Sequence, residues 1–140
     1  MKNQFELSEW AQPNFRAVNK FYRSQKHKGS ASGDERVFII SGQDELIAAV
    51  RLVPYNGYFW LRSLYVKSEL RGQALGKQLL TLVRQKIEFP IYCFPYTHLE
   101  TFYENAGYSL LTLEQLPQPL NQLFNKYRGK GDGIICMLSE

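Results

Sequence analysis

The hydrophobic positions of the chain change from a strand-like to a helix-like spacing between residues 58 and 87. Residues 58–66 (YFWLRSLYV) are mostly aromatic or β-branched, as strands tend to be. From residue 75 onward, apolar side chains recur every three or four residues and would share one helical face. That face consists of Leu75, Leu79, Leu82, Val83 and Ile87. The pattern therefore predicts strand, tight loop and helix in succession over residues 61–87.

The segments before this stretch predict a strand, a helix and two further strands. The predicted strands are 5–10, 36–41 and 46–53, and the predicted helix has Pro13 in its first turn and Phe15, Val18, Phe21 and Tyr22 on its apolar side. Asn56-Gly57 is the strongest hairpin signal, because both central residues of the favoured two-residue turn have positive φ. Three consecutive antiparallel strands are therefore expected to lead into the loop that precedes residue 75.

Between that predicted helix and the next strand, residues 23–33 (RSQKHKGSASG) are polar, basic and glycine-bearing. This composition predicts a mobile loop, and loops held by a rigid scaffold often carry recognition residues. A solvated connection without a role in binding is the alternative interpretation.

Downstream of residue 87 the pattern predicts short strands that alternate with helices. The predicted strands are 91–94, 108–113 and 134–138, and an amphipathic helix starting at Pro119 precedes the last of them. Thr97 followed by Glu100 has the spacing of a capping box, which would open another helix. Gly107 stands where a left-handed residue commonly ends a helix.

The loop between the central strand and helix has the composition of an anion-binding site. Its sequence, Arg71-Gly72-Gln73-Ala74-Leu75-Gly76-Lys77, places small and basic residues at a helix N-terminus. Backbone N–H groups there have no partner within the helix, and the helix dipole favours negative charge, so a phosphate or pyrophosphate would be bound. The loop is not a Walker loop, because Lys77 is followed by Gln78, and it lacks the third glycine of the dinucleotide fingerprint.

Length and composition narrow the class of protein further. At 140 residues the chain is expected to form one domain, residues 1–140. The longest apolar runs have five residues, too short to span a bilayer, and the N-terminus has no apolar signal core. Cys93 and Cys136 have no neighbours at metal-ligand spacing, so neither a metal site nor a disulfide framework is expected. These observations favour a cytoplasmic protein.

The formal net charge is +4, from 17 Lys and Arg against 13 Asp and Glu. Such a balance suits an anionic small molecule as well as nucleic acid. The basic residues are spread along the chain and are denser only at 23–28 and 126–130. Because a nucleic-acid-binding face needs clustered charge, this distribution argues against nucleic acid as a partner.

Two segments resemble the hallmarks of the GNAT superfamily of N-acetyltransferases. The family's acyl-CoA loop, Arg/Gln-x-x-Gly-x-Gly/Ala, is matched by Arg71-x-x-Ala74-x-Gly76. Its aromatic-Tyr-Glu-x-x-Gly-aromatic segment is matched by Phe102-Tyr103-Glu104-Asn105-Ala106-Gly107-Tyr108. The two motifs stand in the family's order, on the elements it requires, with one predicted strand between them, and on them the chain is identified as a member.

The resemblance implies a single α/β (α+β) domain with a mixed, mostly antiparallel central sheet, helices on both faces, and fourth and fifth strands that splay apart. In the family the pantetheine arm of acetyl-CoA lies between those strands, and its amides pair with an exposed strand edge. Carried over to this chain, the cofactor-binding residues are Leu64, Tyr65, Val66, Arg71, Gly72, Gln73, Ala74, Leu75, Gly76, Lys77, Leu99 and Phe102.

The implied activity is transfer of an acetyl group from acetyl-CoA to a primary amine by direct attack, without a metal. Tyr103 would lie beside the CoA sulfur, where a phenol of pKa ~10 can protonate the departing thiolate. The amine also has to lose a proton, and His98, Glu69 and water are all candidates for the base. The acceptor, a small-molecule or protein amine, is left open by the sequence. Homodimers are common in the family, so a second copy is one partner to expect.

Two positions depart from the family pattern. Ala74 replaces the usual glycine, which costs roughly 1 kcal/mol if the position needs positive φ and little otherwise. Tyr96 stands where the family often has Asn. These departures leave a second interpretation open, a non-catalytic CoA-binding sensor or interaction module of the same fold. A third, a basic nucleic-acid-binding domain, depends only on net charge and aromatic content.

Overall fold

The computed structural model describes residues 5–129 and 133–140, and within them seven strands form one sheet. Their order across the sheet is β1-β2-β3-β4-β5-β7-β6. The strands are β1 (Glu6–Glu9), β2 (Arg36–Gly42), β3 (Glu45–Tyr55), β4 (Tyr58–Val66), β5 (Ile91–Cys93), β6 (Ser109–Leu111) and β7 (Cys136–Ser139). Neighbours run antiparallel except β4 and β5, which are parallel. This arrangement confirms the expected mixed, mostly antiparallel sheet.

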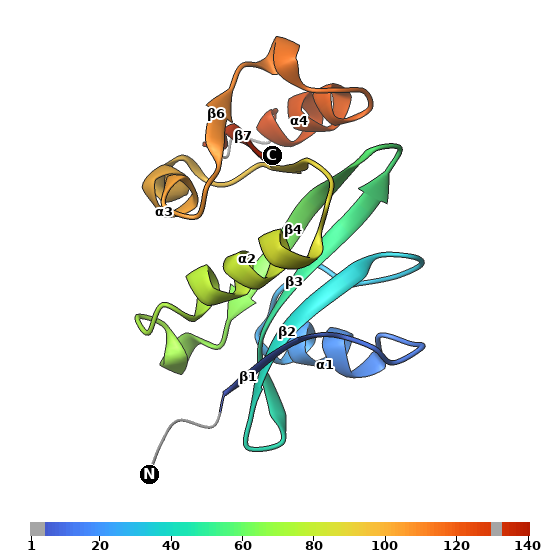
Figure 1. The fold of residues 1–140 in the computed structure, drawn as a ribbon, viewed down its shortest axis with the longest axis vertical. Coiled ribbons are helices and arrows are strands. Elements are labelled where there is room, and N and C mark those ends of the chain that lie inside the picture. Colours follow the sequence, from blue (N-terminus) through green and yellow to red (C-terminus); the bar gives the residue numbers. More distant parts are fainter. Residues whose placement is uncertain (1–4, 130–132) are drawn as a thin grey trace.

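Helices cover both faces of this sheet (Figure 1). The α-helices are α1 (Arg16–Ser24), α2 (Leu75–Lys86), α3 (Glu100–Glu104) and α4 (Leu120–Arg128), and 3-10 turns lie at Ser68–Leu70, Thr97–Leu99 and Leu113–Gln115. Successive residues of β2 point to opposite faces: Val37 packs in the apolar cluster of α1, and Phe38 packs in the cluster of α2. Since β2 and β3 are buried on both sides, their sequences are nearly continuous apolar runs.

A third apolar cluster brings the C-terminal part of the chain onto β4. Leu120 and Phe124, one turn apart on α4, pack with Trp60 of β4. The Trp60 and Tyr127 rings are 6.1 Å apart at the edge of this cluster. The packing of α4 therefore places aromatic side chains beside the middle of β4.

The fourth and fifth strands pair over a short distance and then separate. The parallel pairing runs from Phe59 opposite Ile91 to Leu61 opposite Cys93, whereas β4 continues to Val66. Beyond Leu61, the edge of β4 that faces β5 has no strand partner among the described residues. The predicted splay is confirmed, and it leaves backbone N–H and C=O groups free for another molecule.

Thr97 does not cap a helix as its spacing predicted. Thr97 lies within the 3-10 turn Thr97–Leu99, and α3 begins after Leu99 without a side-chain cap. The Thr97 hydroxyl donates instead to the Gly133 carbonyl at 3.1 Å, because the segment that leads into β7 runs beside it. The capping box in this part of the chain is formed by Thr112 and Gln115.

The turn with two positive-φ residues lies between β2 and β3, and not between β3 and β4 as the sequence predicted. Asn56-Gly57 joins β3 to β4 as predicted. Only Gly57 has positive φ (+91°), however, so this turn is of a different type, one in which only the second central residue needs positive φ. The turn with two positive-φ residues is Gln43-Asp44 (+54° and +67°), between β2 and β3.

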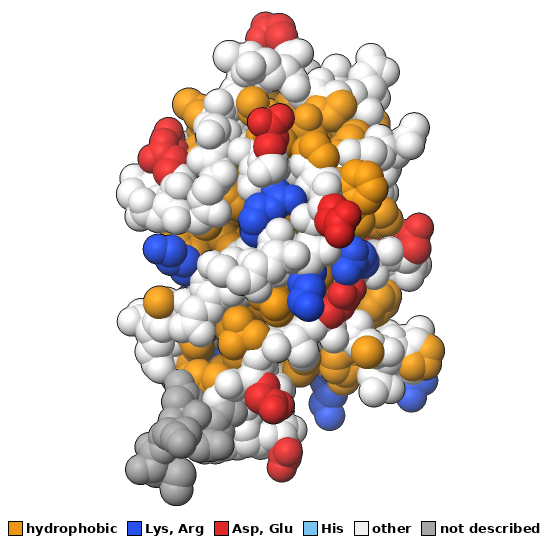
Figure 2. Space-filling model, viewed as in Figure 1, with side chains coloured by type: hydrophobic (Ala, Val, Ile, Leu, Met, Phe, Trp, Pro, Cys, Tyr) orange, Lys and Arg blue, Asp and Glu red, His pale blue; other side chains and the backbone are white. Residues whose placement is uncertain are grey.

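Acidic and basic side chains are interspersed on the face seen in Figure 2, with no continuous basic stripe. In residues 5–129 and 133–140, no helix is long and apolar enough to cross a membrane. The same ranges contain no group of three or more His, Cys, Asp or Glu side chains placed to hold a metal ion.

Candidate active site

A groove of about 570 Å³ lies where β4 has lost its partner, against the start of α2 and one side of α3. Of the residues that the resemblance assigned to the cofactor, all except Gln73 and Lys77 line this groove, together with Leu70. At Gly76 an added Cβ would lie 3.3 Å from the Phe102 ring, so a glycine here lets the first turn of α2 approach α3 closely. The groove therefore joins both motifs on one surface.

The loop into α2 supplies backbone donors at the groove. Gly72 and Ala74 both have positive φ, +88° and +63°, and α2 starts directly after Ala74. No side chain caps this end of the helix, and its first turn contains no acidic residue. The first N–H groups and the positive end of the helix dipole are therefore left for an anion.

The left-handed conformation of Ala74 resolves the alternative that the sequence left open. A Cβ in this region is strained by about 1–2 kcal/mol, and glycine is not. Replacing Ala74 with glycine is therefore expected to raise the melting temperature and the free energy of unfolding, by about 1 kcal/mol, measured by thermal and urea unfolding.

Ala17, exposed in the first turn of α1, is the matched control for this substitution. Ala17→Gly is expected to change stability in the opposite direction, by at most about 0.5–1 kcal/mol, because glycine is unfavourable in a right-handed helix. Destabilisation by both substitutions would mean that position 74 is not strained.

Arg71 is one of the residues that line the groove. Its guanidinium stacks 4.7 Å from the Tyr65 ring centre, and its Nε donates to the Val66 carbonyl at 2.9 Å. That carbonyl faces the splay, because the opposite side of the same peptide, the Lys67 N–H, donates to β3. Arg71 thus connects the strand edge to the loop and keeps its terminal nitrogens for a ligand.

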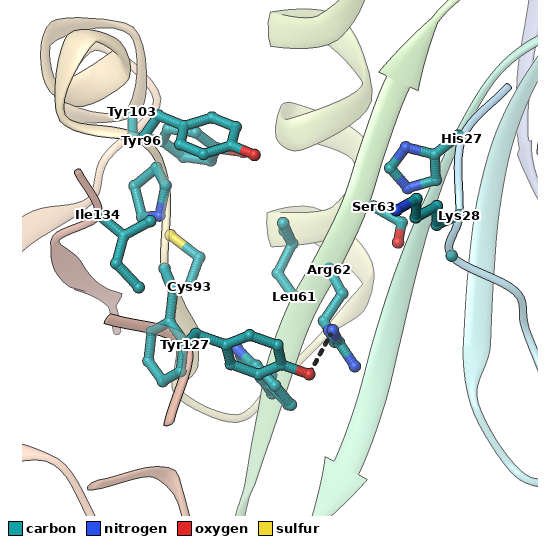
Figure 3. A pocket seen from close by; sticks show the side chains of 14 residues that line it. His27, Lys28, Leu61, Arg62, Ser63, Cys93, Tyr96, Tyr103, Tyr127 and Ile134 are labelled. Atoms are coloured by element: carbon teal, nitrogen blue, oxygen red, sulfur yellow. Dashed lines mark hydrogen bonds between the residues drawn. The ribbon is translucent and has the colours of Figure 1, made fainter. Parts of the chain in front are cut away.

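A second cavity of about 330 Å³ adjoins the groove along β4. Leu61, Arg62 and Ser63 line this cavity, and the next three residues of β4 line the groove. Its other walls include His27 and Lys28 from the loop after α1, Phe94 and Tyr96 after β5, Tyr103 of α3 and Tyr127 of α4. Figure 3 shows these side chains converging from both sides of the splay.

Tyr103 is buried, with its hydroxyl pointing into this cavity (Figure 3). Its ring is held edge-on by Phe102 and Tyr108, at centroid distances of 5.1 and 5.5 Å. Burial raises the pKa of the phenol well above its usual value, and the neighbouring Cys93 and Tyr108 act in the same direction. The hydroxyl makes no hydrogen bond within the described part of the chain, so it is a protonated donor available to a ligand.

His27 faces the same cavity from the opposite side (Figure 3). Its ring lies between Tyr22 and Tyr65, at centroid distances of 5.1 and 5.3 Å. Burial lowers the pKa of His27, and the guanidinium groups of Arg51 and Arg62 lower it further. His27 is therefore a neutral imidazole at pH 7, able to accept a proton.

The two side chains that the sequence offered as the general base lie elsewhere. His98 is exposed and stacks on Tyr96 at 5.9 Å, and Glu69 is exposed beside Lys67. Neither lines the cavity that contains Tyr103. Sequence reasoning missed His27, although it is the histidine of the 23–33 loop, whose composition indicated recognition.

Ser63 makes β4 bulge at the boundary of the two spaces. It has a positive φ of +58°, and the register with β3 shifts there. Tyr22 Oη donates to the Ser63 carbonyl at 2.7 Å, and Arg51 Nη1 donates to Ser63 Oγ at 2.9 Å. Arg51 is in turn held by both carboxylate oxygens of Glu35, at 2.9 and 3.0 Å. A buried network thus holds the strained residue in place.

The structure thus has the splayed sheet edge beside a helix N-terminus that the resemblance to GNAT proteins implied. A family model described as "Acetyltransferase (GNAT) domain" matches residues 33–110, which is more than half of the chain. The chain therefore belongs to the GNAT acetyltransferase family.

Solved structures share this fold at low sequence identity. Escherichia coli ElaA matches with a TM-score of 0.70 at 19% identity, over 98% of this chain and 100% of that one. N-acetylglutamate synthase from Neisseria gonorrhoeae, complexed with coenzyme A and N-acetyl-glutamate, has a TM-score of 0.70 at 15% identity, but this chain covers only 35% of it. A GNAT family acetyltransferase from Elizabethkingia anophelis with acetyl-CoA bound has a TM-score of 0.64 at 12% identity, with 99% of each chain covered. No curated protein sequence matches the chain.

Proposed function

We propose that this protein is an N-acetyltransferase that transfers the acetyl group of acetyl-CoA to a primary amine by direct attack on the thioester. The observation that carries the proposal is the arrangement of two spaces on consecutive residues of β4. One has the donors for a diphosphate and an open strand edge, and the other contains a protonated phenol opposite a neutral imidazole. A cytoplasmic location agrees with the two free thiols, Cys93 and Cys136.

The groove fits acetyl-CoA by the chemistry of its donors. The uncapped start of α2 and Arg71 suit the diphosphate, and the unpaired edge of Leu64–Val66 suits the amides of the pantetheine arm. The thioester would then lie near the Ser63 bulge, where the groove meets the cavity. An amine bound in the cavity can reach it from the side of His27.

In the proposed reaction each proton has a named acceptor or donor. The amine nitrogen forms a bond to the thioester carbonyl carbon, and the carbon–sulfur bond breaks. His27 takes a proton from the amine, directly or through a water molecule, and Tyr103 gives its proton to the departing sulfur. The products are an N-acetyl amine and coenzyme A.

Removing the basic side chains of the loop tests where CoA binds. Arg71→Ala combined with Lys77→Ala is expected to weaken CoA and dephospho-CoA alike by a few kcal/mol, because both contain the diphosphate and charge-assisted hydrogen bonds are worth about 1.5–3 kcal/mol each. Calorimetry measures the change. Lys86→Ala, at the other end of α2, is the control. Unchanged affinity in the double variant would exclude this loop as the diphosphate site.

The pH dependence of turnover tests His27. Because the pKa of His27 lies below the ordinary value of about 6.5, kcat/KM calculated for the concentration of neutral amine should rise through that lowered pKa and then stay level toward about pH 9. The high pKa of Tyr103 keeps the acid protonated over that range. His27→Gln should abolish the acidic limb of the profile, and His98→Gln should retain it. An unaltered limb in His27→Gln would assign the base to another group.

Two measurements separate catalysis from the alternative of a CoA-binding module without turnover. Calorimetry with acetyl-CoA shows whether the groove binds it, and release of free thiol in the presence of an amine panel shows whether transfer follows. Tight binding without thiol release for any amine would favour the binding module.

A further inference from the structure

The cavity that Tyr103 lines has basic side chains in its wall and, among the described residues, no carboxylate to balance them. Arg62 and Lys28 line it beside His27, and no Asp or Glu is among the described residues of its wall. Glu35 is close by, but it is buried against Arg51 in an ion pair of its own. A ligand in this cavity therefore meets an excess of positive charge.

Arg62 is the center of this charge. It is half-buried, its guanidinium lies 4.3 Å over the Trp60 ring and 5.4 Å from the Tyr127 ring, and its Nη2 donates to Tyr127 Oη at 3.0 Å. These contacts fix the plane of the guanidinium and use one of its five N–H donors. Arg51 and Arg36 each bind a carboxylate at 2.9 and 2.8 Å, whereas Arg62 has no acidic partner in the described ranges.

A fixed, partly desolvated guanidinium without a counterion favours a planar or tetrahedral anion, which it can bind through two parallel hydrogen bonds. The same positive charge disfavours a cationic amine and lowers the pKa of a bound ammonium group, which promotes the neutral nucleophile. A polyamine or an aminoglycoside carries several cations, so the positive charge of this cavity would not favour its binding. The volume of about 330 Å³ suits a molecule of amino-acid size.

We propose that the acceptor is a small primary amine that also carries an anionic group, a carboxylate or a phosphate, and that Arg62 binds that group. This inference rests on the proposed acetyl transfer. The anion would be held near Trp60 and Tyr127, and the amine would point along β4 toward Ser63, between His27 and Tyr103. Lys28, exposed at the rim, would attract the anion as it enters.

Paired acceptors test this assignment. Thiol release is measured with L-tryptophan against tryptamine, L-histidine against histamine, L-lysine against cadaverine, and O-phosphoethanolamine or 2-aminoethylphosphonate against ethanolamine. In at least one pair the anionic member should have the higher kcat/KM, and the pair in which this happens separates carboxylate from phosphate. Binding of the same compounds in the presence of CoA is measured by calorimetry.

Substitutions of Arg62 test whether this residue binds the anionic group. Arg62→Gln should lower kcat/KM for the preferred acceptor by about 10- to 150-fold more than kcat/KM for the amine of the same pair that lacks the anion, as the loss of charge-assisted hydrogen bonds predicts. Arg62→Lys should recover part of the loss. Arg128→Gln is the control, because Arg128 also stacks on an aromatic ring, Phe124 at 5.5 Å, but does not line the cavity.

The outcomes separate this inference from the proposed function. Turnover that is equal within every pair, or higher for the amine without an anion, overturns the anion site while acetyl transfer stands. Arg62-dependent binding of an anionic amine without thiol release from any compound supports the anion site and contradicts transfer. Absence of both binding and thiol release overturns both.

Discussion

Replacing Tyr103 with phenylalanine is expected to lower kcat by about 10²–10⁴-fold and to leave the KM for acetyl-CoA nearly unchanged. The phenol acts mainly as negative charge develops on sulfur, and the ground-state thioester barely needs its hydrogen bond. The ring keeps its edge contacts with Phe102 and Tyr108, so stability should change little. Steady-state thiol release gives kcat and KM, and thermal unfolding gives stability.

Tyr108→Phe is the matched control for this experiment. Tyr108 is also buried, burial likewise raises its pKa, and its ring packs 5.5 Å from Tyr103, but it does not line the cavity. Loss of its hydroxyl should therefore leave kcat unchanged. If acetyl transfer proceeds at the wild-type rate in Tyr103→Phe, the phenol is structural and water or another residue supplies the proton.

The parts of the site that depend on local sequence were predictable. The spacing of Leu75, Leu79 and Val83 fixes which side of α2 faces the sheet, and these residues are buried as expected. The order of strands around the loop followed from turn signals such as Gly57. The splay could not be read from periodicity, because apolar residues continue along β4 to Val66, past Arg62 and Ser63, and it came from the resemblance of two motifs to a family.

The parts that depend on distant contacts were not predictable. Nothing in residues 23–33 has a period, and His27 takes its position from aromatic rings on α1 and β4. Gly29 shows how close this loop comes to β4, since an added Cβ would clash with Ser63 Oγ. Ser63 itself has a conformation rare for a serine in a strand, and it is held by bonds from Tyr22 and Arg51, 41 and 12 residues away.

The ion pair behind the Ser63 bulge is expected to contribute far more to stability than a pair of the same geometry at the surface. Glu35 binds Arg51 through two hydrogen bonds of 2.9 and 3.0 Å, and Glu9 binds Arg36 through two of 2.8 Å. The side chains of the first pair are 7% and 9% exposed, and those of the second are 37% and 34% exposed. Burial is thus the main difference between them.

Glu35→Gln is therefore expected to lower the free energy of unfolding by about 3–5 kcal/mol, because it leaves the buried Arg51 guanidinium without a counterion. Glu9→Gln should cost at most about 1 kcal/mol, since water solvates the released Arg36. Urea unfolding measures both. Replacing the pair together, Glu35→Leu with Arg51→Met, should recover much of the stability but not the activity, because Ser63 Oγ loses its donor and the bulge between groove and cavity is no longer held. Equal losses for Glu35→Gln and Glu9→Gln would show that burial does not set the strength of this pair.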